Sequence, residues 1–559
     1  MLIQRAGARA RARAWPWTLL ALAALAAGIV LRLWQLRSQM LIDDEWHSVR
    51  MLVHADMGTI ATHFGIADYC IPLTLFYRWL YQHAALDEWW MHLPLLLAGI
   101  ATLGVLPALL RRELSAATRA AWIALLAISP SLVYFSRTAR PYALTALLGF
   151  FAIVAFHRWH ARAPHRRAWA AGYLLASALA AWLHLLTLVF TLWPFVHYGV
   201  RALSKALRRD SRGQGMRDLV RLFVLAMPLL ALLALLLGPP LANDWQAMAG
   251  KAAAGRVSAG SLWRSLLIAV GTGRSWAGIA LTALFVLGAL RLWRRERDLA
   301  ALALGAMAVG TGVICAARPA WIEHAPVLVR YCAPVLPWLL LCVAEGMSAV
   351  FERVRDARVA ALAAAGTLSG VFLLGPVPGW LYVPNQFMDH AIFQFDYDVD
   401  ANPYAKLVQL GPVSPFYLAL ARQPAGSMTL VETPARAHSN YMPDPWLQRI
   451  HRQNVEYALA SPVCGVGEWD EYPSTATGDR FRRMVRLSDI LSGTSSGADY
   501  LLMRRHPWSI PPAPDFPLPL PWPDMDACIA RVAQRLGRPV YEDAQLAVFA
   551  LTPQVLPGR

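Results

Sequence analysis

The stretch PYALTALLGFFAIVAFHRWHARAPHRR, residues 141–167, decides the fold class of this chain. Its first part, 141–157, is an apolar run that reaches the lower limit of about 17 residues for a helix that crosses a bilayer. A cluster of basic residues follows: Arg158, Arg162, Arg166 and Arg167. Because such clusters stay on the cytoplasmic side, we predict a membrane span whose C-terminal end faces the cytoplasm.

Apolar stretches of this length recur along the chain, and hydrophobic residues make up 57% of its 559 residues, which excludes an ordinary soluble enzyme. The Arg-rich N-terminus is followed by an apolar run that is long for a signal peptide and has no small-residue cleavage site, so we interpret it as the first span. The prediction is a polytopic α-helical membrane protein with about 11 transmembrane helices. The predicted spans are about 17–36, 91–110, 119–136, 141–157, 168–183, 186–200, 219–239, 276–292, 299–317, 328–349 and 358–377.

The charges of the loops orient these spans. Lys and Arg total 52 against 35 Asp and Glu, a net charge of +17. The basic residues lie in short clusters within alternate loops, so the excess indicates membrane topology, and no nucleic acid partner is predicted. We expect a multi-pass protein of a bacterial inner (plasma) membrane, in contact with membrane lipid, with its N-terminus in the cytoplasm.

The chain divides into two predicted parts. Residues 1–377 form a transmembrane module with a long first extracytoplasmic loop at 37–90, and residues 378–559 form a periplasmic C-terminal domain. The β-like runs SMTLVE, ADYLLM and QLAVFAL, separated by Pro-rich connectors, predict a mixed α/β domain. A disulfide between Cys464 and Cys528 is compatible with that compartment. A structural cap is the favoured role for the domain.

Three successive carboxylates, Asp43, Asp44 and Glu45, follow the first span. Their mutual repulsion at a low-dielectric surface raises at least one pKa, which suits a general base. The alternative is a solvated acidic turn, or a cap on a helix that starts near Trp46.

Arginines also occur on the predicted extracytoplasmic face, where positive-inside statistics disfavour them. Arg137 and Arg140 precede Pro141, which is well suited to start a helix, and an arginine pair beside a helix N-terminus suits a phosphate. Arg330 and Tyr331 lie at the mouth of the tenth span, where the arginine is a second candidate for a lipid phosphate. The alternatives are snorkelling to interfacial lipid for the first pair and an ion pair with a carboxylate such as Glu323 for Arg330.

Two further signals are less specific. His184 falls between the fifth and sixth spans on the same face, where a lone histidine is more often an interfacial residue than a ligand. The loop 37–90 holds His47, His54 and His63 beside its carboxylates, but no HExxH-like spacing fixes two ligands on one helix face. No cofactor is predicted as certain, and the metal requirement stays open, with a divalent metal as one alternative.

The order of these features resembles the GT-C glycosyltransferases. The resemblance rests on the acidic DE pair after the first span, on SRTARPYAL at 136–144, on a histidine after the fifth span and on a late Arg-Tyr span with prolines. It covers roughly 15–350 and is greatest to bacterial protein O-mannosyltransferase-like enzymes and to the lipid A aminoarabinose transferase. The chain departs from the family in keeping only Pro72 of a His-Pro-Pro stretch and in having His92 where relatives often have Arg.

The resemblance implies a role for each candidate residue. It makes Asp44 the catalytic carboxylate, with Glu45 completing the pair and Asp43 beside it. It makes Arg137, Arg140 and Arg330 ligands of the donor phosphate, with His184, Tyr142 and Tyr331 as further site candidates. The implied reaction is an inverting transfer of a sugar from a polyprenyl-phosphate carrier to an extracytoplasmic acceptor, which is a lipid, a glycan or a protein. Two alternatives remain: a transporter or flippase for lipid-linked sugar, and a surface polysaccharide ligase or polymerase.

Overall fold

The computed structural model describes residues 2–34, 36, 45, 55–65, 69–83, 88–250, 252–378, 413–424, 426–435, 447, 450–451, 453–459, 464, 484–493, 497–505 and 524–552. The chain forms two compact units. The helical unit comprises Met1–Trp34, Gly58–Leu73 and His92–Pro378. The sheet unit comprises Gln35–Met57, Thr74–Met91 and Gly379–Arg559.

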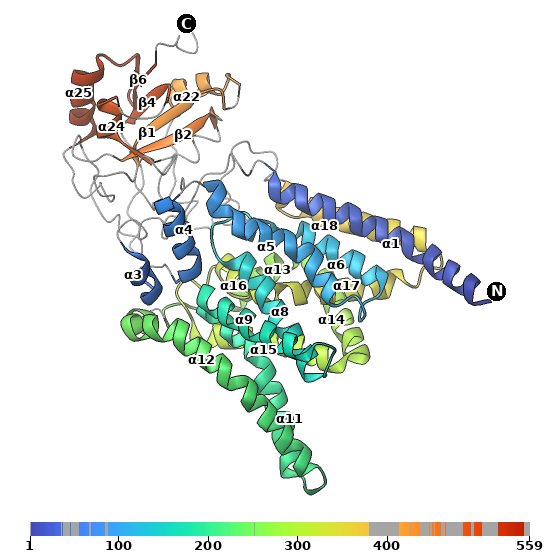
Figure 1. The fold of residues 1–559 in the computed structure, drawn as a ribbon. Coiled ribbons are helices and arrows are strands. Elements are labelled where there is room, and N and C mark those ends of the chain that lie inside the picture. Colours follow the sequence, from blue (N-terminus) through green and yellow to red (C-terminus); the bar gives the residue numbers. More distant parts are fainter. Residues whose placement is uncertain are drawn as a thin grey trace. The chain divides into compact units, whose positions relative to one another are not determined.

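The first unit is a bundle of apolar helices (Figure 1). Nine of the helical segments in the described residues are long and apolar enough to cross a membrane. Every predicted span has a helical counterpart. Two predicted spans fall outside these nine segments: 168–183 corresponds to α9, and 119–136 corresponds to the pair α6 and α7. The long helices are α1 (Leu2–Leu33), α5 (Glu88–Leu109), α6 (Ala116–Ile128), α8 (Tyr142–His160), α9 (Arg166–Leu183), α11 (Trp193–Leu207), α12 (Arg212–Gly250), α13 (Ala259–Val270), α14 (Ser275–Arg295), α15 (Arg297–Ala317), α17 (Leu336–Phe351) and α18 (Ala357–Leu374). The shorter ones are α3 (Met57–Thr62), α7 (Pro130–Phe135), α10 (Leu188–Thr191) and α16 (Ala325–Tyr331). Another short helix, α4 (Ile71–His83), belongs mostly to the sheet unit, because that unit includes Thr74–Met91.

The predicted span 119–136 is two helices rather than one. The α-helix α6 ends at Ile128, and α7 begins at Pro130 after Ser129, whose side chain accepts a hydrogen bond from the backbone N–H of Leu132 at 3.5 Å. Proline has no N–H to donate to the carbonyl four residues earlier, so the helix is interrupted at this point. The break leaves backbone carbonyls at the end of α6 for other groups to satisfy.

The predicted loop 240–275 contains more helix than the sequence indicated. Helix α12 continues to Gly250 with a kink at Asp244, and α13 occupies Ala259–Val270. A capping box explains where α13 starts: the Ser258 hydroxyl accepts from the backbone N–H of Ser261, and the Ser261 hydroxyl accepts from the backbone N–H of Ser258, both at 3.0 Å. At 12 residues, α13 is too short to span a bilayer.

Small residues bring the bundle helices close together. A Cβ added to Gly288 in α14 would lie 1.7 Å from the Cys342 carbonyl oxygen of α17, and one added to Gly346 would lie 1.9 Å from the Leu284 carbonyl oxygen. In hydrocarbon, where no hydrophobic effect drives helices together, such close backbone contact supplies van der Waals packing. Helices α14 and α17 are therefore a closely packed pair.

The second unit contains a six-stranded sheet in the order β3-β2-β1-β4-β6-β5. Strands β1 to β4 are parallel, whereas β6 is antiparallel to both β4 and β5. The bounds are β1 (Thr429–Ala435), β2 (Asn454–Leu459), β3 (Met484–Arg486), β4 (Tyr500–Arg504), β5 (Tyr541–Glu542) and β6 (Leu546–Ala550). The predicted runs SMTLVE, ADYLLM and QLAVFAL correspond to β1, β4 and β6, which confirms the mixed α/β prediction.

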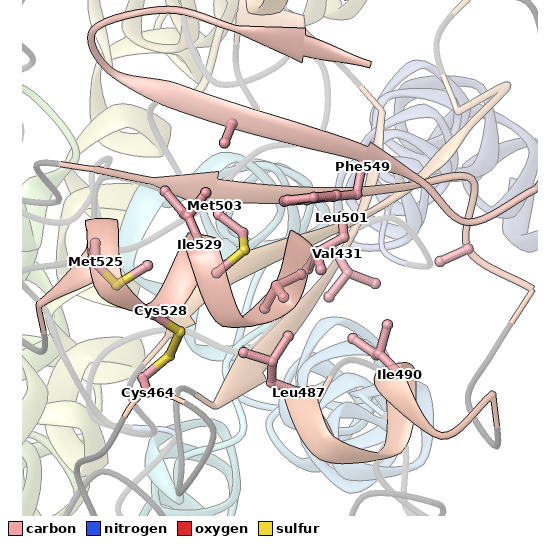
Figure 2. Close-up of a cluster of buried hydrophobic side chains, with 13 residues drawn as sticks. Val431, Cys464, Leu487, Ile490, Leu501, Met503, Met525, Cys528, Ile529 and Phe549 are labelled. Atoms are coloured by element: carbon pink, nitrogen blue, oxygen red, sulfur yellow. A yellow bond between two sulfur atoms is a disulfide. The ribbon is translucent and has the colours of Figure 1, made fainter. Parts of the chain in front are cut away.

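Both faces of this sheet are covered. Leu501 and Met503 of β4 pack with Phe549 against α24 (Leu487–Leu491) and α25 (Met525–Leu536), as Figure 2 shows. The alternate residues Tyr500 and Leu502 pack on the other face, in a cluster that includes Phe416 and Leu420 of α22 (Pro415–Leu420). Alternation along a buried strand sends successive side chains to opposite faces, so β4 is buried throughout.

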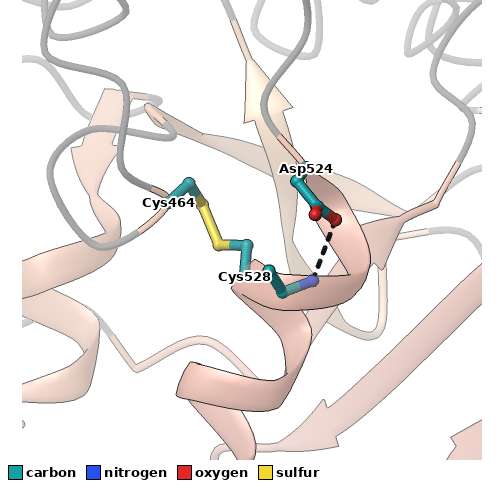
Figure 3. Close-up of a disulfide and its surroundings, with 4 residues drawn as sticks. Cys464, Asp524 and Cys528 are labelled. Atoms are coloured by element: carbon teal, nitrogen blue, oxygen red, sulfur yellow. Dashed lines mark hydrogen bonds between the residues drawn. A yellow bond between two sulfur atoms is a disulfide. The ribbon is translucent and has the colours of Figure 1, made fainter.

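A disulfide joins Cys464 to Cys528 of α25, as the sequence allowed (Figure 3). Asp524 caps the same helix, because its carboxylate accepts a hydrogen bond from the backbone N–H of Ala527 at 3.1 Å. Both sulfur atoms lie in the buried cluster beneath α25. The disulfide therefore links two cysteines that are 64 positions apart in the sequence and that both belong to this hydrophobic core.

Candidate functional site

The segment between α7 and α8 holds two of the predicted phosphate ligands. Ser136 ends α7, and Pro141 starts α8 with a φ of −69°, close to the fixed angle of proline and suited to a first helical turn. Arg137 and Arg140 lie in the turn between them and are only 5% and 9% exposed. A short buried turn of this kind holds two cationic side chains next to a helix N-terminus, where backbone N–H groups favour an anion.

The Arg137 guanidinium is held by the backbone of another helix. Its Nη1 donates to the carbonyl oxygen of Leu31 in α1 at 3.1 Å. Burial lowers the pKa of the Arg137 guanidinium to about 10, so the group is still protonated at neutral pH. A guanidinium can donate charge-assisted hydrogen bonds to a phosphate, so Arg137 is a candidate ligand for one.

Four other predicted residues converge in the same unit. The Arg330 guanidinium lies 5.8 Å from the Tyr142 ring centre and 5.6 Å from that of Tyr331. The His184 ring lies 5.9 Å from the Tyr142 ring and 5.5 Å from the Tyr331 ring. The fold therefore brings together three points that are far apart in sequence: the first residue of α8, the end of α9 and the end of α16.

The local backbone explains why these side chains meet. Helix α9 ends at His184, where the chain becomes extended with a φ of −162°, and α16 ends directly after Tyr331. Aromatic faces attract a guanidinium by about 0.5–2 kcal/mol, more when water is excluded, so the two tyrosines orient Arg330.

The predicted carboxylates after the first span are described only in part. Glu45 is buried, with 1% of its surface exposed, whereas Asp43 and Asp44 lie outside the described residues. Glu323, the alternative ion-pair partner of Arg330, instead accepts a hydrogen bond from the backbone N–H of Arg256 at 3.2 Å. The general-base assignment therefore stays a prediction.

The described residues contain no group of three or more His, Cys, Asp and Glu side chains that could hold a metal ion. His63, one of the loop histidines, makes a 3.1 Å contact through Nδ1 with the carbonyl oxygen of Thr59 in its own helix. His47 and His54 lie outside the described residues. The metal requirement is thus still open.

One buried arginine was missed in the sequence. Arg32, in the last turn of α1, is fully buried and donates from Nε to the Ser136 hydroxyl at 3.1 Å. The signal was present, because Arg32 is the only charged residue in the predicted span 17–36. A charge in hydrocarbon is costly, so such a residue is by default a functional candidate.

Comparisons with known proteins give structural similarity only. No family model matches the chain, and no curated protein matches it. The chain is similar to the crystal structure of ArnT from Cupriavidus metallidurans in the apo state, with 15% identity and a TM-score of 0.42 over 96% of this chain and 97% of that one. The same enzyme bound to undecaprenyl phosphate matches with 15% identity and a TM-score of 0.42 over 97% and 99%.

A second similar structure is the archaeal oligosaccharyltransferase AglB from Archaeoglobus fulgidus, in complex with an inhibitory peptide and a dolichol-phosphate. It matches with 12% identity and a TM-score of 0.41 over 78% of this chain and 64% of that one. Identities of 12–15% and TM-scores of 0.41–0.42 assign no function to this chain. We therefore base the functional assignment on the residues of this chain.

Proposed function

We propose that the chain is an inverting membrane glycosyltransferase that moves a sugar from a polyprenyl-phosphate carrier to an extracytoplasmic acceptor. The observation that carries this proposal is the convergence of Arg330, Tyr142, His184 and Tyr331, with Arg137 and Arg140 on the turn that starts α8. Cationic groups among aromatic rings at helix ends suit a phosphate attached to an apolar lipid chain. A soluble phosphate would need no such apolar surroundings.

The reaction divides between an acidic and a basic part. The acceptor oxygen or nitrogen attacks the anomeric carbon while the bond from that carbon to the phosphate oxygen breaks, which releases polyprenyl phosphate. Asp44 takes the proton of the acceptor, and Arg137, Arg140 and Arg330 stabilise the negative charge that develops on the leaving phosphate. Because one displacement occurs, the anomeric configuration inverts.

The test is release of polyprenyl phosphate by the purified full chain in lipid nanodiscs. A panel of polyprenyl-phosphate sugars serves as donors and a membrane extract as acceptor. We expect turnover of one donor, inversion in the product by NMR, and a loss of about 100-fold or more in Asp44→Asn, because a general base contributes about 10²–10⁴-fold. Glu45→Gln shows whether the second carboxylate of the pair takes part.

Asp356→Asn is the matched control. Asp356 is a helix cap whose carboxylate accepts hydrogen bonds from the N–H groups of Arg358 and Val359, so its loss affects a helix end and not the proposed chemistry. Two results together would favour the flippase over the transferase. The donor sugars would bind without release of polyprenyl phosphate, and they would cross proteoliposome membranes equally well in wild type and Asp44→Asn.

A further inference from the structure

The proline break between α6 and α7 leaves a backbone carbonyl in need of a donor. Leu126 lies four residues before Pro130, and in a continuous helix its carbonyl would accept from the N–H that proline lacks. Arg32 of α1 takes that place: its Nη2 donates to Leu126 O at 3.0 Å, and its Nη1 donates to Ala127 O at 3.2 Å. The guanidinium thus closes the open end of α6.

The same guanidinium holds the other side of the break. Its Nε donates to the Ser136 hydroxyl at 3.1 Å, and that hydroxyl in turn donates to Leu132 O at 2.5 Å. The next residue, Arg137, returns a hydrogen bond to Leu31 O at 3.1 Å. Hydrogen bonds therefore run both ways between the two segments: residue 32 donates to residue 136, and residue 137 donates to residue 31.

Glycine permits this close approach. A Cβ added to Gly99 in α5 would lie 2.0 Å from the Ser136 hydroxyl oxygen and 3.3 Å from Arg32 Nε. A Cβ added to Gly28, one turn before Arg32, would lie 2.8 Å from the Ala127 Cβ. Helices α1 and α5 thus both lack a side chain at points where the hydrogen bonds of Arg32 need room. This is independent evidence that packing fixes the geometry of the Arg32 guanidinium.

No carboxylate of the described residues hydrogen-bonds to the buried guanidinium of Arg32. It has no exposed surface, and within the described residues its hydrogen bonds end on the neutral oxygens of Gly28, Leu126, Ala127 and Ser136. A buried cation costs several kcal/mol unless opposite charge or dipoles compensate it. The carbonyl end of α6 supplies dipoles, and an anion near Ser136 would supply the rest.

We infer that Arg32 is a positioning residue of the donor-phosphate site, which fixes the Ser136–Arg140 turn across the proline break so that Arg137 is held in place for a lipid-linked phosphate. This inference rests on the proposed function for the identity of the ligand. Arg32 is bonded to the backbone and to Ser136, so its effect on the phosphate passes through its neighbours.

The experiment measures two quantities on the full chain in nanodiscs: the affinity for polyprenyl phosphate alone, and the kcat and KM for the lipid-linked donor. Arg32→Gln is expected to weaken polyprenyl phosphate binding and to raise the donor KM by about 10-fold or more, the equivalent of one charge-assisted hydrogen bond. Because Arg32 acts through Arg137, Arg32→Gln in an Arg137→Gln background should add little. Arg32→Lys should restore part of the affinity, since an ammonium cannot reach all the acceptors of a planar fork.

Arg158→Gln is the matched control. Arg158 is half-buried, donates to the Leu109 carbonyl at 3.0 Å and pairs with Glu113 at 2.5 Å, so its loss also disturbs a helix end. Arg158→Gln should lower the stability of the chain and leave the polyprenyl phosphate affinity and the donor KM within about twofold of the wild-type values. If Arg32→Gln does not fold, Ser136→Ala tests the same link, because it removes one acceptor and keeps the guanidinium; a rise of about threefold in the dissociation constant is expected.

Binding and turnover separate the two claims. A wild type that binds polyprenyl phosphate but turns over no donor disproves the transferase and leaves the binding series to decide the role of Arg32. Three results would each overturn the inference. The first is an unchanged polyprenyl phosphate affinity in Arg32→Gln and Ser136→Ala, and the second is a loss of affinity in these variants no larger than in Arg158→Gln. The third is a loss from Arg32→Gln that multiplies fully with the loss from Arg137→Gln in the double variant. A wild type that does not bind the lipid phosphate overturns both.

Discussion

Both units bury arginines, and two of them, Arg32 in the helical unit and Arg504 in the sheet unit, have different partners. Arg32 in α1 donates only to neutral oxygens within the described residues, whereas Arg504 at the end of β4 donates to the Glu432 carboxylate of β1 at 2.9 Å. Glu432 is itself fully buried and also faces His451 at 3.5 Å. The charge in the sheet unit is balanced inside the fold, which indicates a structural role.

The charges near the other ends of the helices resemble Arg504 more than Arg32. Arg291 of α14 pairs with Glu345 of α17 at 3.2 Å and with Glu352 at 2.5 Å. Arg295 lies 3.6 Å from the same buried Glu345. These pairs hold α14 and α17 together. The comparison therefore separates arginines whose charge is balanced by a carboxylate from Arg32, whose partners within the described residues are neutral oxygens.

The strongest test of this separation is Glu432→Gln. It removes the carboxylate partner of a buried guanidinium, and breaking a buried ion pair costs about 3–5 kcal/mol. We expect the sheet unit to lose that much stability, measured by hydrogen exchange of the β1 and β4 amides in the full chain, while polyprenyl phosphate affinity is unchanged. A large loss of that affinity would show that the sheet-unit pair is not merely structural.

The neighbouring residue Arg505 provides the control. Its partners Asp526 and Glu542 have side chains that are 66% and 51% exposed. Exposed ion pairs contribute less than about 1 kcal/mol, so Arg505→Gln should have a small effect on the same amides. Equal losses in Arg505→Gln and Glu432→Gln would mean that burial does not distinguish the two pairs.

A smaller effect is expected at Arg330, whose guanidinium lies beside the rings of Tyr142 and Tyr331. Tyr331→Leu removes one aromatic face from both Arg330 and His184. Since a cation–π contact at a partly exposed position contributes about 0.5–1 kcal/mol, the donor KM should rise about two- to fivefold. Tyr331→Phe keeps the ring and should stay near wild type. A loss in Tyr331→Phe as large as in Tyr331→Leu would point to the hydroxyl and against the cation–π account.

Much of the helical unit follows from the sequence because apolar length and loop charge are local signals. The predicted spans 91–110 and 141–157 correspond to α5 and α8 within a few residues. The proline break was missed because hydropathy does not register a missing N–H donor, although Ser129-Pro130 is visible in the sequence. Strand β3 was missed because its three residues are too few for a pattern of alternation.

The candidate site was predictable where a residue breaks a statistical rule. Arg137, Arg140 and Arg330 were found because basic residues are disfavoured on their predicted face, and the structure brings Arg330 together with Tyr142 and Tyr331. Arg32 could not be assigned a role in this way. Its partners are backbone carbonyls of α6, and only tertiary packing determines which carbonyls α1 meets. The catalytic assignment of Asp44 stays a prediction, because this residue lies outside the described part of the chain.

The smallest expected effect concerns Asp543, which is the anionic counterpart of Arg32 because its hydrogen-bond partners within the described residues are neutral. Its carboxylate accepts hydrogen bonds from the hydroxyls of Ser414 and Tyr541, at 2.5 and 2.9 Å, and from the backbone N–H groups of Gln545 and Leu546, both at 2.8 Å. Burial alone would raise the pKa of this carboxyl, but these hydrogen bonds outweigh it and hold the pKa below its ordinary value of 3.8.

A pKa that is lower in the folded state stabilises the fold above the ordinary pKa, and this contribution is lost as the pH falls through the folded value. Asp543→Asn should therefore destabilise β6 at neutral pH by about 1 kcal/mol or less after solvent screening, and by less still at acidic pH. Hydrogen exchange of the β6 amides, corrected for the intrinsic rate at each pH, measures this difference. If the wild type and Asp543→Asn lose stability in parallel as the pH falls from 5 to 2, neutral donors do not hold this charge, and the same doubt would extend to the neutral partners of Arg32.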